Sequence, residues 1–302
     1  MQRKRTDLAV EAREIWSESA ERQTKLSGVE AHEYRREGCS VTHVRILDEE
    51  GAQALDKPVG SYVTVELDGL ARRENDAFHR AVTALAGELL PLLPPEEAKG
   101  TALVVGLGNR AITPDAVGPL CMESVMVTRH LVEHLPDAFG HLRPVAALTP
   151  GVLGTTGLES AEIIRGVMGR SHPRVILMVD ALASRKLSRL CRTVQIADTG
   201  IVPGSGVGNA RAALNRETLG VPVIAIGVPT VVDAVTLVGD MAESAGLSGF
   251  DEEALAQFDG GLIVTPKEID THVEDIARVI AYAVNLCLHP GLSIDDIANF
   301  LA

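Results

Sequence analysis

From about residue 100 onward, short apolar runs alternate with segments of helical character, and this alternation constrains the possible fold more than any other feature of the sequence. The runs are nearly continuous in Val, Ile, Leu and Ala, which is typical of strands buried on both faces of a sheet. We therefore predict an α/β fold with a mainly parallel sheet covered by helices on both faces. The apolar runs are residues 102–106, 145–148, 175–179, 193–196, 223–226 and 262–264, and the helical segments are residues 114–135, 157–168, 232–245, 271–288 and 294–301.

The first 95 residues have a different character. Residues 7–25 are charged and helix-favouring, and two β-like runs follow at 41–47 and 62–67, separated by Gly and Pro. A helical stretch near residues 74–90 ends at a proline-rich break. We predict that residues 8–95 form an N-terminal helix and a small β-containing section, and that residues 96–302 form the α/β core.

Charge and cysteine content exclude several classes of protein. The formal net charge of −13 disfavours nucleic acid as a direct partner, because duplex binding depends on clustered Lys and Arg. The four cysteines are scattered and form no C-x-x-C pair, so neither a disulfide framework nor a zinc knot is indicated. No secretory signal is recognisable, and the most apolar long stretch, residues 276–288, is too short to cross a bilayer. We expect a cytoplasmic protein with no membrane partner.

Two aspartates follow apolar runs at the edge where open α/β sheets bind ligands. Asp180 ends the run 175–179, and Asp115 lies in a first helical turn that Thr113 would cap and Pro114 would open. The helix dipole there leads us to expect a lowered pKa for Asp115. One acid of such a pair can be ionised and activate water while the other keeps its proton. The same two acids could instead hold a divalent metal, and each alone could be an ordinary capping residue.

Two further motifs suggest other functions. Residues 106–111 match the pattern Gly-x-Gly-x-x-Ala of dinucleotide-binding loops, so a nucleotide-binding regulatory module is an alternative, although the helix start at Pro114 falls too late for it. Residues 130–134 match the inverted zinc-protease motif H-x-x-E-H, so a metal-dependent protease using the two acids with His130 is another. No third ligand is evident, and we favour a solvated or capping role for His130 and His134.

No serine or cysteine nucleophile motif is present in the sequence. Gly-rich turns follow two of the apolar runs. Glycines let a peptide backbone approach closely, although tight loops forced by packing have the same composition. We expect four of these glycines to contact a substrate: Gly151, Gly154, Gly204 and Gly206.

Read together, several long stretches of the chain resemble the germination protease family of endospore-forming bacteria. They occur in order from residue 5 nearly to the end of the chain, and so many ordered matches are highly specific. The stretches are residues 5–12, 106–119, 128–130, 150–159, 179–185, 198–200, 203–209 and 223–234.

The resemblance implies an endopeptidase that begins the degradation of small acid-soluble spore proteins during germination, in the cytoplasm of the forespore or spore core. It implies a core like that of the hydrogenase maturation endopeptidases (phosphorylase/hydrolase-like), a homotetramer, and no cofactor or metal. By motif, the family's two essential aspartates fall on Asp115 and Asp180.

Members of the family are made as inactive precursors that cut themselves near the N-terminus. The family's substrates are cut before an apolar residue in a stretch such as Glu-Ile/Phe-Ala-Ser-Glu. Residues 7–11, Asp-Leu-Ala-Val-Glu, have the same order of residue types. The resemblance therefore implies self-cleavage between Asp7 and Leu8, with residues 1–7 as the leader.

Overall fold

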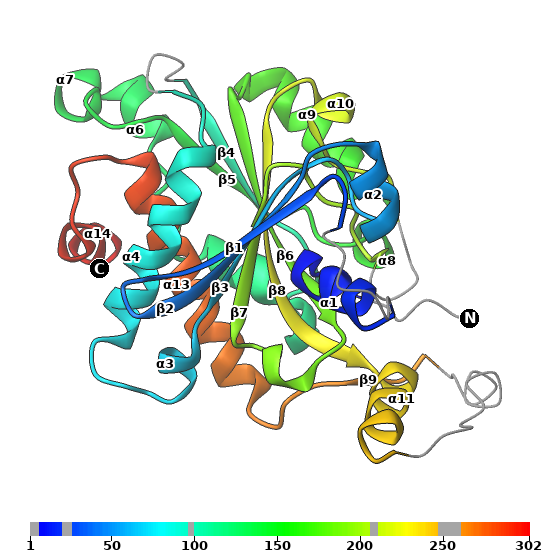
Figure 1. Ribbon diagram of the computed structural model, residues 1–302. Coiled ribbons are helices and arrows are strands. Elements are labelled where there is room, and N and C mark those ends of the chain that lie inside the picture. Colours follow the sequence, from blue (N-terminus) through cyan, green and yellow to red (C-terminus); the bar gives the residue numbers. More distant parts are fainter. Residues whose placement is uncertain (1–5, 20–25, 96–99, 206–210, 247–260) are drawn as a thin grey trace.

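The structure is a computed structural model that describes residues 6–19, 26–95, 100–205, 211–246 and 261–302. Its centre is one mixed sheet in the order β1-β2-β3-β7-β8-β6-β4-β5, with β9 paired to β8 (Figure 1). The strands are β1 (Val29–Arg36), β2 (Cys39–Ile46), β3 (Gly60–Glu66), β4 (Ala102–Gly106), β5 (Val145–Leu148), β6 (Val175–Ser184), β7 (Thr193–Ala197), β8 (Val223–Asp233) and β9 (Ile263–Val264).

The helices surround this sheet. They are α1 (Ala9–Ser19), α2 (Glu49–Leu55), α3 (Asp68–Ala71), α4 (Ala77–Leu89), α5 (Val117–Met122), α6 (Arg129–His134), α7 (Pro136–Phe139), α8 (Leu153–Thr156), α9 (Ser160–Ser171), α10 (Arg216–Leu219), α11 (Ala234–Ser244), α13 (Ile269–Leu288) and α14 (Ile294–Leu301), with short 3₁₀ turns η1 (Leu90–Leu92), η3 (Thr113–Asp115) and η4 (Leu187–Arg189).

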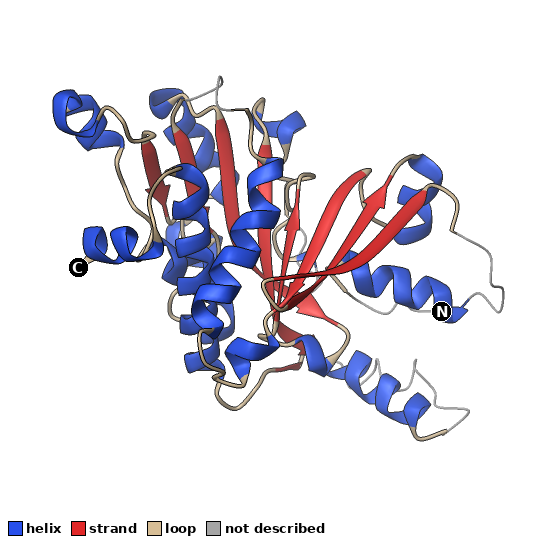
Figure 2. Cartoon of the chain, turned by 60° about the vertical axis from the view of Figure 1, so that its left-hand side comes forward, coloured by secondary structure: helices blue, strands red, loops and turns tan. Residues whose placement is uncertain are grey.

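Strands β5, β4, β6 and β8 are parallel to one another, whereas β1, β2, β3 and β7 add antiparallel pairs. The N-terminal strands join the core sheet directly, because β3 pairs with β7 from Tyr62↔Ala197 to Glu66↔Thr193. Figure 2 shows the strands as one twisted sheet with helices on both sides. The predicted α/β class is confirmed, with the parallel order confined to one half of the sheet.

Two sets of helices cover the two faces. One core cluster joins α4, α5, α13 and α14 to alternate residues of the central strands, such as Leu177 and Ile226. The opposite face is covered by α9 and α10 over β4 and β6, and by α1 and α2 over β2 and β3. Alternate residues of β6 therefore point to opposite faces, as the two-residue period of a strand requires.

Local signals explain several element boundaries. Asp48 caps α2 by accepting the Gly51 N–H at 2.9 Å, and Ser293 caps α14 by accepting the Asp296 N–H at 3.1 Å. The long helix α13 buries Val273, Ile276 and Ile280 at three- and four-residue spacing, and every residue from 279 to 285 is buried because α4 and α5 also pack against this helix. In the described part of the chain, no helix is both long and apolar enough to span a membrane.

Two predicted elements were wrong. The helix expected at 114–135 is broken into η3, α5 and α6. Between α5 and α6, the Asn285 side chain of α13 binds the backbone: it accepts the Met126 N–H and donates to the Ser124 carbonyl, each at 2.9 Å. The buried strand expected at 262–264 is a two-residue edge strand, and Ile263 is exposed.

Candidate active site

Asp180 lies inside β6, four residues before its end at Ser184. The sequence led us to expect it just after the strand, but β6 continues to Ser184 because β8 pairs with it throughout. Neighbouring strand β4 ends at Gly106, which pairs with Val179. Asp180 is thus the first residue of β6 beyond the end of β4, and the loop that follows β4 can reach it.

That loop carries Asp115 in the turn η3, which contacts β6, β8 and α13. The Asn109 N–H donates to Asp115 Oδ2 at 2.8 Å, and the Leu107 N–H donates to the Val179 carbonyl at 2.8 Å. Gly108 has a φ of +107°, and a Cβ atom there would collide with the Asp115 carbonyl oxygen. The glycine loop that resembled a nucleotide fingerprint therefore closes tightly around Asp115.

Two expectations about Asp115 were wrong. The residue preceding η3 is Ile112, and Thr113 makes no side-chain cap. The pKa of Asp115 is raised above its ordinary value and not lowered, because burial outweighs the hydrogen bond from Asn109. A three-residue turn offers only a small dipole, so desolvation decides the direction.

Burial and a neighbouring charge act together on Asp180. Only 6% of the residue is exposed, and burial raises its pKa well above the ordinary value. The Asp115 carboxylate raises this pKa further, as does that of Asp7, whereas the Ala181 N–H, which donates to Asp180 Oδ1 at 2.9 Å, opposes the shift. The structure thus brings Asp115 and Asp180 together, and burial raises the pKa of both acids.

The chain's own N-terminal segment lies across this region, with Asp7 fixed to β6. Its N–H donates to the Ala183 carbonyl at 3.0 Å, and its Oδ2 accepts the Ala183 N–H at 2.9 Å. The Ser205 hydroxyl donates to Asp7 Oδ1 at 2.8 Å. Leu8 is fully buried and packs with Val10 against Leu182. Both residues of the predicted cleavage site are therefore held within two or three positions of Asp180 along β6.

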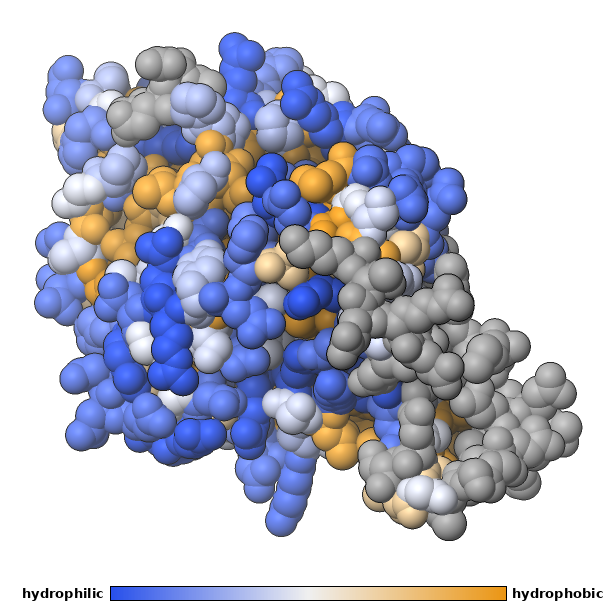
Figure 3. Space-filling model, viewed as in Figure 1, coloured by the Kyte–Doolittle hydropathy of each residue, from blue (hydrophilic) through white to orange (hydrophobic). Residues whose placement is uncertain are grey.

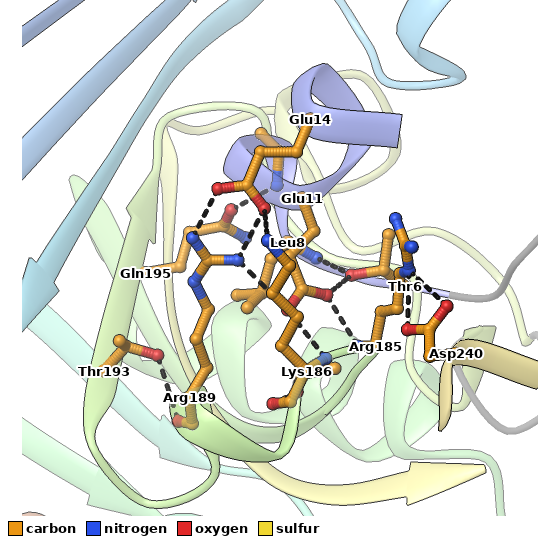
Figure 4. Close-up of polar contacts among 12 residues, drawn as sticks. Thr6, Leu8, Glu11, Glu14, Arg185, Lys186, Arg189, Thr193, Gln195 and Asp240 are labelled. Carbon is orange, nitrogen blue, oxygen red and sulfur yellow. Dashed lines mark hydrogen bonds and ion pairs between the residues drawn. The ribbon is translucent and has the colours of Figure 1, made fainter. Parts of the chain in front are cut away.

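Glu11 anchors the same segment at its other end (Figure 4). Its carboxylate is fully buried and accepts hydrogen bonds from the Thr6 hydroxyl, the Arg185 N–H, the Lys186 N–H and Arg189 Nη1, at 2.6, 2.6, 3.1 and 3.2 Å. The Lys57 ammonium also binds this segment, because it donates to the Thr6 carbonyl at 3.2 Å. Residues 6–11 are thus held by hydrogen bonds from several separate elements.

The predicted substrate-binding glycines are distributed over two loops. Gly204 has a φ of +74° and lies beside Ser205, which contacts Asp7. Gly151 and Gly154 lie in the loop and short helix α8 that follow β5, and the Gly151 carbonyl accepts from Ser160. Gly206 lies outside the described residues.

The histidine motif sits apart from the two acids, on helix α6. His130 and His134 are both exposed, and Glu133 pairs with Arg129 at 2.8 Å. Among the residues that the structure describes, no three His, Cys, Asp or Glu side chains gather as a metal-ligand set.

Sequence reasoning missed several residues that contact the N-terminal segment: Lys57, Arg189, Gln195 and Ser205. Gln195 offered one signal, because it is a polar residue inside an otherwise apolar stretch of β7 and is nevertheless 93% buried. Ser205 lies between two of the glycines that the sequence analysis selected, whereas no sequence signal distinguishes Lys57 and Arg189.

Comparison with known proteins decides the family. A family model described as germination protease matches residues 9–245 and 248–301. The chain belongs to the germination protease family. It is therefore a protease that acts in spore germination, as the resemblance in the sequence led us to expect.

Relatives named as members of the germination protease family match almost end to end. The germination protease of Clostridium tetani is 44% identical over 98% of this chain and 99% of its own length. Those of Caldanaerobacter subterraneus subsp. tengcongensis and Bacillus licheniformis are 45% and 40% identical over 98% and 97% of this chain and 98% and 95% of their own lengths. A solved NiFe hydrogenase maturation protease, HycI from Thermococcus kodakarensis KOD1, is similar over 62% of this chain and 93% of its own, with 21% identity and a TM-score of 0.34.

Proposed function

We propose that this protein is an endopeptidase in which Asp115 and Asp180 share one proton and activate a water molecule. The observation that carries the proposal is that the loop after β4 places Asp115 beside the buried Asp180, where burial and the Asp115 charge raise the pKa of Asp180. Two carboxyl groups that cannot both ionise easily can divide the roles of base and acid. Because Asp115 is less buried and accepts the Asn109 N–H, we assign the ionised form to Asp115 and the proton to Asp180.

In this mechanism Asp115 takes a proton from water, and the water oxygen bonds to the carbon of the peptide carbonyl. Asp180 gives its proton to the carbonyl oxygen, which yields a neutral tetrahedral intermediate. The C–N bond then breaks: the amide nitrogen takes the proton held by Asp115, and a hydroxyl of the intermediate returns its proton to Asp180. Both acids recover their starting states, and one water molecule is consumed for each bond cut.

We further propose that the substrates are small acid-soluble spore proteins, and that the chain is a zymogen that first cuts itself between Asp7 and Leu8. The position of residues 6–11 against β6 supports self-cleavage, because this places the Asp7 carboxylate close enough to raise the pKa of Asp180. Gly151, Gly154, Gly204 and Gly206 remain our candidates for contacts with the substrate backbone.

The assembly and compartment are also proposals. We propose a homotetramer in the forespore or spore core. The face in Figure 3 shows hydrophobic residues gathered around α4 among mostly hydrophilic ones. Large hydrophobic side chains that are exposed, such as Leu90, Met241 and Leu262, offer contacts for self-association. The subunit number can be measured by light scattering after size-exclusion chromatography.

The mechanism is tested by incubating purified protein with a spore-protein peptide and mapping the masses of the peptide and of the protein's own N-terminus. Wild-type protein should cut the peptide before an apolar residue and lose residues 1–7. Asp115→Asn and Asp180→Asn should do neither while unfolding cooperatively. Wild-type turnover in either variant would refute the mechanism, and a wild-type protein that cuts no peptide would refute the endopeptidase assignment.

A further inference from the structure

Gln195 contacts the carbonyl of the peptide bond between Asp7 and Leu8 and the N–H of the next peptide bond, between Leu8 and Ala9. Its Nε2 donates to the Asp7 carbonyl oxygen at 3.2 Å, and its Oε1 accepts the Ala9 N–H at 2.7 Å. The orientation of the amide is fixed by these partners, because a carbonyl can only accept and a backbone N–H can only donate. Figure 4 shows the side chain pointing from β7 toward the start of α1.

Sheet register places Gln195 in the same row as Asp180. Gly227 of β8 pairs with Asp180 of β6 on one side and with Gln195 of β7 on the other. Paired residues point to the same face, so the two polar side chains flank Gly227, with their Cα atoms separated by two strand spacings, or about 10 Å. A peptide held between them can be contacted from both directions.

The N-terminal segment spans this gap. Asp7 bonds to Ala183 of β6 through its N–H and carboxylate, and to Gln195 of β7 through its carbonyl. Leu182 lies over Gly227, where a Cβ atom would collide with it, and Leu8 packs on Leu182. Gly227 thus leaves room for Leu182, on which Leu8 packs. The Asp7 carbonyl, on the other side of the Asp7–Leu8 bond, is hydrogen-bonded to Gln195 of β7.

We propose that Gln195 is a catalytic residue of this protease, one that donates a hydrogen bond to the carbonyl oxygen of the bond being cut. The proposal rests on the proposed self-cleavage between Asp7 and Leu8. Negative charge grows on that oxygen as water adds to the carbon, before Asp180 delivers its proton. A fixed N–H donor, 93% buried and oriented beforehand by the Ala9 N–H, stabilises that charge more than it stabilises the uncharged carbonyl.

Two substitutions separate this role from simple support of the segment. Gln195→Glu keeps an acceptor for the Ala9 N–H but loses the amide donor, whereas Gln195→Met fills similar space and loses both. Thr193→Val serves as the control, because Thr193 is a buried residue on the same face of the same strand whose hydroxyl bonds to the Arg189 carbonyl. Thermal unfolding of each variant checks that the fold is retained.

Self-cleavage is followed by mass spectrometry as a first-order reaction, which involves no binding step. Cleavage of a synthetic peptide with the sequence of residues 1–19 supplies kcat and KM. Loss of an oxyanion donor lowers kcat by about 100- to 1000-fold, and we expect losses of that size for Gln195→Met in both reactions, with KM little changed. Gln195→Glu should recover relative to wild type as the pH falls, because a protonated carboxyl can donate; Gln195→Met should not.

Wild-type kcat in Gln195→Met, or a loss confined to KM, would overturn the role of Gln195. A loss in Thr193→Val equal to that in Gln195→Met would overturn it as well, since it would assign the effect to strand packing. Wild-type protein that cuts neither itself nor the peptide would instead refute the proposed function on which this inference rests.

Discussion

The carboxylate of Asp115 raises the pKa of Asp180, although the two residues lie on separate elements and are 65 positions apart in the chain (180 − 115). The contact depends on β4 ending one residue short of Asp180, so that the loop after β4 folds back over β6. Burial of Asp180 is the larger cause of its raised pKa, whereas the Asn109 N–H stabilises the ionised form of Asp115. The difference in environment between the two acids predicts which of them carries the proton.

The pH profile of self-cleavage should have a basic limb that is set by Asp180. Activity requires Asp180 to be protonated, so it should fall as the pH rises through the raised pKa of Asp180. Since the Asp7 charge contributes to that rise, Asp7→Asn should lower the pKa of Asp180 and move the basic limb to lower pH. Rates measured from pH 4 to 9 by mass spectrometry test this, with Asp137→Asn, an exposed residue of α7, as the control. An unmoved basic limb in Asp7→Asn would contradict the assignment.

Asp180→Asn should be more stable than wild type at neutral pH. The pKa of Asp180 is raised in the folded protein, so the folded state binds a proton that the unfolded state has released above its ordinary pKa of 3.8. Stability from this group is complete below 3.8 and is lost as the pH rises toward the folded value. Removing the carboxylate should therefore raise the free energy of unfolding at pH 7.5, and by less at pH 5, as measured by urea denaturation. A stability deficit independent of pH would argue against a raised pKa.

Glu11→Ala should cost about 3 kcal/mol of unfolding free energy, because it leaves the backbone N–H groups of Arg185 and Lys186 without their acceptor and removes one of the two carboxylates that bind the Arg189 guanidinium. Glu14 is the matched control on the same helix. It also pairs with Arg189, but its side chain is 31% exposed, so Glu14→Ala should cost about 1 kcal/mol or less. Equal losses in the two variants, measured by urea denaturation, would show that burial of Glu11 is not what stabilises the segment.

Strand β6 illustrates how much of the fold can be read from sequence. Its run of Val, Ile, Leu and Met predicts a buried strand, because only apolar residues fit a sheet covered on both faces. Because Asp180 and Ser184 are polar, the sequence pattern does not show that β6 continues past residue 179. The strand continues because β8 pairs with it as far as Ser184. The sequence pattern therefore locates the strand and Asp180, but the length of β6 is set by its pairing with β8.

The candidate site was predictable only where local sequence carries the signal. Asp115 and Asp180 stand out beside apolar runs, and the family resemblance selects them. Gln195 and the Asp7 carbonyl are 188 positions apart, and a single sequence does not tell which face of β7 meets the N-terminal segment. The wrong direction expected for the pKa of Asp115 has the same cause, since burial is decided by distant elements and the helix dipole by local ones.

Gly108→Ala should displace Asp115 and reduce peptidase activity. The φ of +107° disfavours any residue with a Cβ, and the added carbon would collide with the Asp115 carbonyl oxygen, so the loop must shift. A displacement of about 1 Å at a reacting group costs on the order of 100-fold in rate. Gly166→Ala in α9 is the control: its Cβ meets no atom within 4 Å, and replacing a helical glycine should stabilise the protein by about 0.5–1 kcal/mol without changing turnover. Wild-type turnover of the spore-protein peptide by Gly108→Ala would show that cleavage does not depend on where this loop holds Asp115.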